Sequence, residues 1–134
     1  MAEKKTTAAA AATEPKKIIN LRDHILGADD LKSQPLDIPE WQCTVTIKEM
    51  TGQQRARLLQ NAVDVTSGKM DLEKMYPELA VYSVYDPDTM HPLFQLADRE
   101  LLNTKSGAAL ERIATVAMKL SGLSNRSVED AVKN

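Results

Sequence analysis

A change of hydrophobic period at Thr51 constrains the fold of this chain more than any other feature of its sequence. Before Thr51, apolar and polar residues alternate over 41–47, and a shorter alternation covers 36–38. A period of two that includes β-branched residues predicts two short strands, and the Pro-Glu-Trp-Gln sequence predicts the corner of a hairpin. Because an isolated hairpin is marginally stable at best, we expect helices to cover its apolar face.

After Thr51 the apolar residues follow helical spacing. Thr51 and Gln54 predict a capping box at the start of one helix, which Gly68 ends. Asp71 predicts the N-cap of a second helix, and Pro77 predicts a kink or a restart within it. The side chains expected to point inward are Leu58, Leu59, Ala62, Val63 and Val65 in the first helix, and Leu72, Met75, Leu79 and Tyr82 in the second.

The remaining sequence predicts further short helices. Residues 18–26 predict one or two helical turns before Gly27, residues 84–94 a turn-rich connection, and residues 95–103 another short helix. Ser106 predicts the N-cap of a longer helix that ends at Gly122, with Leu123 in a Schellman contact. We expect a final helix after Ser124 or Ser127, with these apolar positions: Val128, Ala131 and Val132.

Length and composition predict one domain behind a low-complexity leader. Residues 1–17, rich in alanine and lysine, have no apolar face, so we expect a disordered leader. Residues 18–134 then form a single domain, since 134 residues of which 43% are hydrophobic suffice for one core. The predicted fold is mainly α (α+β), with a small N-terminal β-hairpin packed on a compact bundle of four to five short helices.

Charge and composition argue against several classes of protein. The formal net charge is −2, and the leader's charge of +2 leaves −4 on the rest of the chain. An acidic body disfavours nucleic-acid binding by bulk charge. The single cysteine excludes an internal disulfide and a cysteine-cage metal site. With no apolar run near the ~18 residues of a membrane span and no secretory signal, we expect no membrane partner.

Three groups of residues are candidates for chemical sites. His91 with Asp86 and Asp88 lacks the glycine and glutamate of an EF-hand loop, and the neighbouring prolines favour a plain turn. Cys43 alternates with apolar neighbours, which favours a small buried hydrophobe over a nucleophile. The third group is a small basic spot without interleaved aromatics, a weak nucleic-acid signal: Lys48, Arg55 and Arg57. We therefore expect no catalytic residue, metal or cofactor.

A series of short motifs, taken in order, resembles the siphophage tail assembly chaperones. The motifs are ADDLK at 28–32, IPEW at 38–41, MTGQQR at 50–55, VYD at 84–86, KSGAALERI at 105–113 and LSGL at 120–123. The similarity covers residues 25–134. The chain departs from the family pattern where Asp-Pro-Asp-Thr at 86–89 replaces a glycine-containing turn, and where Gln42 and Cys43 replace two glycines.

The resemblance implies a non-enzymatic chaperone that binds the phage tape measure protein, prevents its aggregation and promotes assembly of the tail tube. It implies three partners: the tape measure protein, the tail tube protein and a frameshifted longer form of the chain itself. It also implies action in the host bacterial cytoplasm and absence from the mature virion. The alternative is a structural tail component, such as a tube or completion protein, retained in the virion.

Two surfaces are expected to bind proteins. The first is an aliphatic groove between the helix that starts at Ser106 and the final helix, and the residues expected to bind a partner are Trp41, Leu123, Val128 and Val132. The second is the hairpin, expected to mediate self-association into a homo-oligomer through Trp41, Val45 and Ile47. The alternative for Trp41 is a role as a cap on the core.

Overall fold

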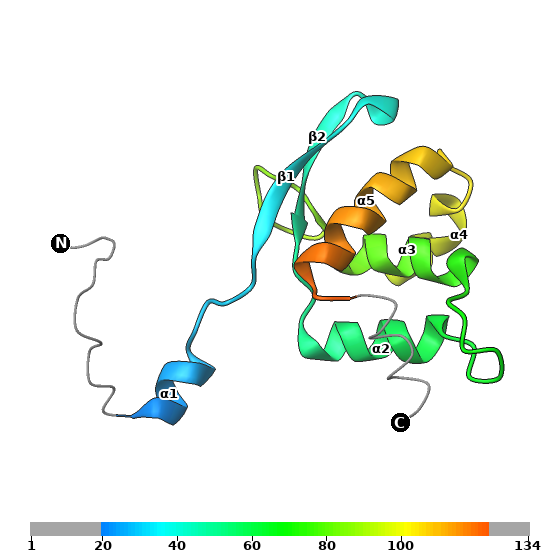
Figure 1. Ribbon diagram of the computed structural model, residues 1–134. Helices are drawn as coiled ribbons and strands as arrows, with labels where there is room; N and C mark the ends of the chain where they lie inside the picture. Colours follow the sequence, from blue (N-terminus) through cyan, green and yellow to red (C-terminus); the bar gives the residue numbers. More distant parts are fainter. Residues whose placement is uncertain (1–19, 124–134) are drawn as a thin grey trace. The chain divides into compact units, whose positions relative to one another are not determined.

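The computed structural model describes residues 20–123 in two units that meet between Asp30 and Leu31 (Figure 1). The described part of the first unit contains helix α1 (Leu21–Leu26), whose N-cap Asn20 accepts a hydrogen bond from the Asp23 amide at 3.1 Å. Gly27 ends this helix, as predicted. The leader and the final helix lie outside the described residues, and the single domain over 18–134 stays a prediction.

A three-stranded antiparallel sheet with the order β1-β2-β3 opens the second unit. Strands β1 (Ser33–Ile38) and β2 (Cys43–Lys48) form the predicted hairpin, with Leu36 opposite Val45. The corner is a short 3₁₀ helix, η1 (Pro39–Trp41), closed by Gln42 in the left-handed conformation. Periodicity does not predict the third strand, β3 (Val84–Tyr85), because two residues carry no measurable period.

The second unit contains the following helices, three of which begin directly after the predicted capping residues. They are α2 (Gly52–Ala62), α3 (Leu72–Ser83), η2 (Leu96–Asp98), α4 (Arg99–Leu102) and α5 (Gly107–Leu120). The side chains of Thr51, Asp71 and Ser106 cap α2, α3 and α5, and Thr51 with Gln54 forms the full capping box. The predicted α+β fold, with a hairpin packed on short helices, is confirmed.

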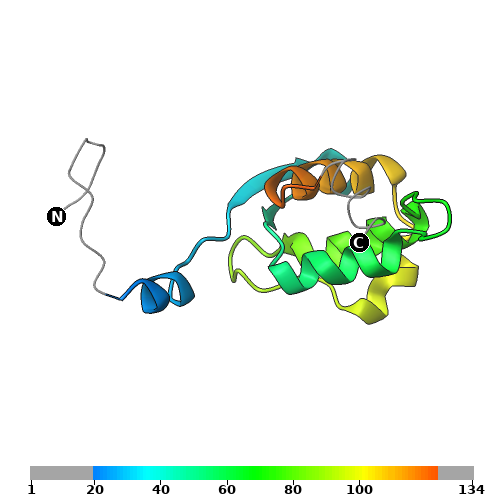
Figure 2. The same ribbon diagram turned by 60° about the horizontal axis from the view of Figure 1, so that its bottom comes forward.

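Helix α5 lies between the hairpin and the other helices (Figure 2). It packs against β1, β2 and η1 on one side and against α3 on the other, while α3 also contacts α2 and α4. The core therefore joins the sheet to the helices. Its largest fully buried aliphatic side chains are Ile38, Ile47, Leu58, Leu79, Ile113 and Val84. Full burial of one such side chain contributes about 1.5–3 kcal/mol to folding.

Pro77 lies inside α3 without ending it, which corrects the predicted restart, while the predicted kink stays a prediction. A proline has no N–H to donate to the carbonyl four residues before it, so the Glu73 carbonyl lacks its helical partner. The side-chain amide of Asn103, at the end of α4, donates to that carbonyl at 2.9 Å. A residue distant in sequence thus satisfies the carbonyl that the proline leaves open, and α3 continues.

Three side chains that were expected to be buried are exposed. Val65 is 75% exposed because α2 ends at Ala62 and not at the predicted Gly68, so the helical spacing does not extend to it. Leu72 is 51% exposed as the first residue of α3. Cys43 is exposed as the first residue of β2, beside the hairpin corner, where alternation alone does not determine burial.

The end of α5 has the predicted Schellman geometry. Gly122 takes a φ of 67°, and the amide of Leu123 donates to the carbonyl of Met118 at 2.9 Å. The neighbouring Ser121 hydroxyl accepts a hydrogen bond from the Met50 amide at 2.9 Å. This buried bond links the end of α5 to the segment between β2 and α2.

Candidate partner-binding surfaces

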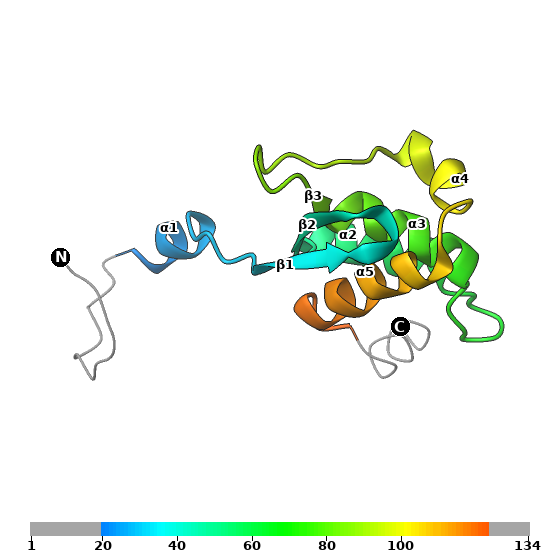
Figure 3. The same cartoon turned by 90° about the horizontal axis from the view of Figure 1, so that it is seen from above.

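An apolar hollow lies beside the hairpin corner, and we call it the Trp-lined hollow. It encloses about 560 Å³ and is lined by Trp41, Phe94, Asp98, Leu101, Leu102 and Lys105. Trp41 comes from η1, Phe94 from the extended connection between β3 and α4 (Figure 3), and both leucines from α4. Its lining combines four apolar side chains with one acidic and one basic residue, which makes the hollow a candidate surface for binding an apolar partner.

Hydrogen bonds fix the backbone segments on both sides of the Trp-lined hollow. The Arg112 guanidinium on α5 makes a bidentate contact with Glu40 in η1, with Nε–Oε1 and Nη2–Oε2 distances of 3.2 Å. These hydrogen bonds lower the pKa of Glu40. On the other wall, Asp98 accepts from the Gln95 amide at 2.8 Å and Arg99 donates to the Leu96 carbonyl at 2.9 Å. Both walls are therefore preorganised, and Leu101 remains 65% exposed.

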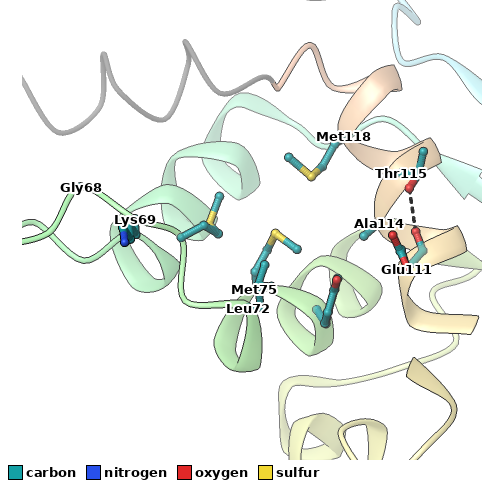
Figure 4. A pocket seen from close by; sticks show the side chains of 10 residues that line it. Gly68, Lys69, Leu72, Met75, Glu111, Ala114, Thr115 and Met118 are labelled. Carbon is teal, nitrogen blue, oxygen red and sulfur yellow. Dashed lines mark hydrogen bonds between the residues drawn. The ribbon is translucent and has the colours of Figure 1, made fainter. Parts of the chain in front are cut away.

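A second apolar hollow, the methionine-lined hollow, lies between α3 and α5 (Figure 4). It encloses about 500 Å³, and Met75 from α3 faces Met118 from α5 across it. The other lining residues are Gly68, Lys69, Met70, Leu72, Tyr76, Glu111, Ala114 and Thr115. Met75 is 3% exposed, so the methionine surface open at this hollow comes from Met70 and Met118, which are partly exposed. Methionine side chains are flexible and polarizable.

A buried polar network joins α2 to α3 and forms part of the packing. Glu78 is 1% exposed, and its Oε2 atom accepts hydrogen bonds from Asn61 Nδ2 at 3.0 Å and from the Tyr82 hydroxyl at 2.9 Å. Burial, together with the hydrogen bond to Glu78, raises the pKa of Tyr82 to about 12. The phenol thus stays protonated and keeps its hydrogen bond across the neutral pH range.

The predicted binding residues fall into three groups. Trp41 is partly exposed and lines the hollow named after it. Val45, Ile47 and Leu123 are buried in the core, at 4%, 0% and 7% exposure. Val128 and Val132 lie outside the described residues. Roles for all six positions in binding stay predictions. Periodicity did not indicate Phe94, because the connection that carries it has no regular spacing, and it did not single out Leu101 on the short helix α4.

One edge of the sheet is β1 and the other is the two-residue strand β3, whereas Val45 and Ile47 lie on the central strand β2. The Glu49 amide donates to the Lys32 carbonyl at 2.7 Å, and bonded pairs alternate along an antiparallel ladder. The amide positions of residues 33, 35 and 37 therefore face the free edge. The middle one is Pro35, which has no N–H, so this edge is poorly suited to adding another strand.

Hydrogen bonds within the segment organise the 86–91 turn, one of the candidates for a chemical site. Asp86 organises the 86–91 turn, since its carboxylate accepts from the Asp88 amide at 2.8 Å and its own amide donates to the His91 carbonyl at 2.9 Å. Among residues 20–123, no cluster of three histidine, cysteine or acidic side chains could hold a metal ion. The plain-turn interpretation of this segment is thus consistent with its hydrogen bonds.

The three residues of the predicted basic spot differ in their surroundings. The Lys48 ammonium lies 5.2 Å from the centre of the Tyr85 ring, and the Nε atom of Arg55 is buried. Arg57 is exposed on α2. Within the described part of the chain, no helix has both the length and the apolar character needed to cross a membrane.

Comparison with known proteins gives a match at the level of structure. No protein-family model matches the chain, and no curated protein matches it. The structure is similar to that of the bacteriophage HK97 tail assembly chaperone, with a TM-score of 0.52 and 19% sequence identity. The match covers 75% of this chain and 95% of the HK97 chain. The chain therefore has the fold of a phage tail assembly chaperone, which confirms at that level the resemblance found in the sequence.

Proposed function

We propose that this protein is a bacteriophage tail assembly chaperone that binds the tape measure protein, prevents its aggregation and promotes tail tube assembly. The observation that carries the proposal is the structural match over 95% of the HK97 tail assembly chaperone. The ordered motifs between residues 25 and 134 support it independently, because they rest on short runs of sequence and not on the arrangement of the elements in space. The tail tube protein and a frameshifted longer form are further proposed partners.

The methionine-lined hollow is the proposed contact for the tape measure protein. It adjoins α5, the helix beside which the sequence predicted a groove, and its methionines suit the varied apolar side chains of a long helical partner. Leu72 is half exposed at the edge of this hollow. Many copies that each bind weakly would cover a long partner through avidity. The role is non-enzymatic, takes place in the host bacterial cytoplasm, and leaves no copy in the mature virion.

The test is co-expression with the tape measure protein of the same phage. We expect the wild-type chain to keep that protein soluble and to co-purify with it. Leu72→Asp places a charge at the edge of the methionine-lined hollow and should weaken binding at least about tenfold. Val65→Asp is the matched control, because Val65 is exposed and does not line the hollow. Val128→Asp combined with Val132→Asp tests the predicted groove.

The outcomes separate the chaperone from its site. A tape measure protein that aggregates regardless of the wild-type chain contradicts the chaperone role. If the Leu72→Asp variant still keeps the tape measure protein soluble, only the proposed binding at the methionine-lined hollow is contradicted. Mass spectrometry of purified virions tests the remaining alternative, since a stoichiometric amount of the chain in the particle would identify a structural tail component.

A further inference from the structure

Helix α1 carries apolar side chains that nothing in the described structure covers. None of its six residues is buried, and Leu21, Ile25 and Leu26 are 59%, 59% and 68% exposed. Leu21 and Ile25 are four positions apart, so they share one face of the helix. A six-residue helix is marginal by itself in water, and burial of this face would stabilise it.

The Trp-lined hollow has the complementary character. Its apolar floor is flanked by Asp98 and Lys105, while α1 carries Arg22 and Asp23 next to its exposed apolar residues. Arg22 Nη1 lies 3.5 Å from Asp23 Oδ1, and the two side chains remain 78% and 69% exposed. Because an exposed pair of this kind is weak, each charge can exchange it for a partner of opposite charge. One chain thus contains an exposed apolar helix with two opposite charges and an apolar hollow with two opposite charges.

We propose that α1 of one copy docks into the Trp-lined hollow of a second copy. Leu21 and Ile25 enter the apolar lining, and Arg22, which lies beside this face of the helix, meets Asp98 at its rim. This assigns self-association to α1 and Trp41, and it leaves Val45 and Ile47 in the core. It also agrees with the absence of a backbone N–H at Pro35, which disfavours association through the edge of β1.

Chain length favours a second copy over the same copy. Residues 27–32 connect α1 to β1, and six extended residues span about 20 Å at most. Strand β1 has six residues and covers about the same length before the corner that holds Trp41. The helix would reach its own hollow only with this connection fully stretched back along β1, whereas a second copy imposes no such requirement.

A contact of this kind does not close on itself. The helix of each copy uses one surface and the hollow uses another, so every added copy offers a new hollow or a new helix, and open chains result unless a rotation closes a ring. Six residues bury far less area than a standard interface, so each junction is weak. Assembly therefore depends on concentration. The inference is independent of the proposed tape measure partner.

Sedimentation velocity of the purified full chain over a range of concentrations tests the inference. We expect the wild-type average mass to rise with concentration, and Ile25→Asp or Leu101→Asp alone to stay monomeric. Both substituted side chains are more than half exposed, so circular dichroism and thermal melting should match the wild type. Val65→Asp is a matched control and should assemble like the wild type.

Mixing the two variants is the decisive step. Ile25→Asp keeps an intact hollow and Leu101→Asp keeps an intact α1, so the mixture should form one-to-one dimers and nothing larger. A wild-type chain that stays monomeric at millimolar concentration overturns the inference. Assembly that either variant retains also overturns it, as does a mixture without heterodimers.

Discussion

Helices α1 and α5 begin and end in similar ways but differ in what they bury. Asn20 caps α1 and Ser106 caps α5, and a glycine follows each helix closely. Yet α1 buries none of its six residues, whereas α5 buries five of fourteen: Ala109, Leu110, Ile113, Ala114 and Ala117. Capping residues determine where a helix begins and ends, whereas tertiary packing supplies most of its stability.

Because α1 and the second unit differ in what they bury, we expect them to respond differently to mutation. The second unit contains the core, the buried Glu78 network and the hydrogen bond from Asn103 to the Glu73 carbonyl. These features should therefore unfold together. Helix α1 contributes exposed apolar surface and no buried side chain. Changes in the second unit should therefore alter the free energy of unfolding, and equivalent changes in α1 should not.

The largest expected effect is that of Ile113→Ala. Ile113 is 1% exposed in the core, so its truncation should lower the free energy of unfolding by about 2–5 kcal/mol. The matched variant Ile25→Ala should change it by less than about 0.5 kcal/mol. Urea unfolding followed by circular dichroism measures both at low protein concentration. A comparable loss from Ile25→Ala would show that α1 packs on the core.

Alkaline pH should destabilise the second unit through Tyr82. The pKa of Tyr82 is raised to about 12 in the folded chain, whereas an unfolded tyrosine ionises near pH 10. Above pH 10 the unfolded chain therefore loses this proton more readily than the folded chain, which favours unfolding. The stabilisation is complete below pH 10 and is lost between pH 10 and 12, by up to about 3 kcal/mol. Unfolding curves in this range measure it. Tyr82→Phe should remove the dependence and Leu21→Ala should retain it; an unchanged slope in Tyr82→Phe contradicts the assignment.

Asn103→Ala should lower the free energy of unfolding by about 1 kcal/mol, because the Glu73 carbonyl loses its donor. Asn20→Ala, which removes the cap of α1, is the matched control and should leave the main transition unchanged. A double-mutant cycle with Pro77→Ala sharpens the comparison, since an alanine at this position would restore the helical N–H. In that background the effect of Asn103→Ala should shrink. Equal effects in both backgrounds would contradict the capping role.

The smallest expected effect is acid sensitivity from Glu40. Hydrogen bonds from Arg112 lower the pKa of Glu40, so the pair stabilises the fold above the unfolded pKa of glutamate. This contribution is lost as the pH falls through the lowered pKa of the folded state, and it is small because the pair is exposed. Thermal melting at pH 7 and pH 3 should show a slightly smaller difference in Glu40→Gln. A larger difference in that variant would reverse the predicted sign.

The sequence by itself determined the elements whose signals are local. Alternation predicted the hairpin of β1 and β2, side-chain caps predicted the starts of α2, α3 and α5, and Gly122 predicted the end of α5. Hydrogen bonds between close neighbours carry these signals, so a single chain segment contains them. The order of the motifs likewise indicated the chaperone fold, since each motif is a short run of neighbouring residues.

Only the tertiary structure decided the features that depend on distant residues. Strand β3 exists because β2 offers it an edge, and α3 continues through Pro77 because Asn103 lies within reach of Glu73. The Trp-lined hollow joins η1 to α4 across more than fifty residues of sequence, so no periodicity predicts it. Periodicity reports which face of an element is apolar, but the neighbours that pack on that face determine whether it is buried, as the contrast between α1 and α5 shows.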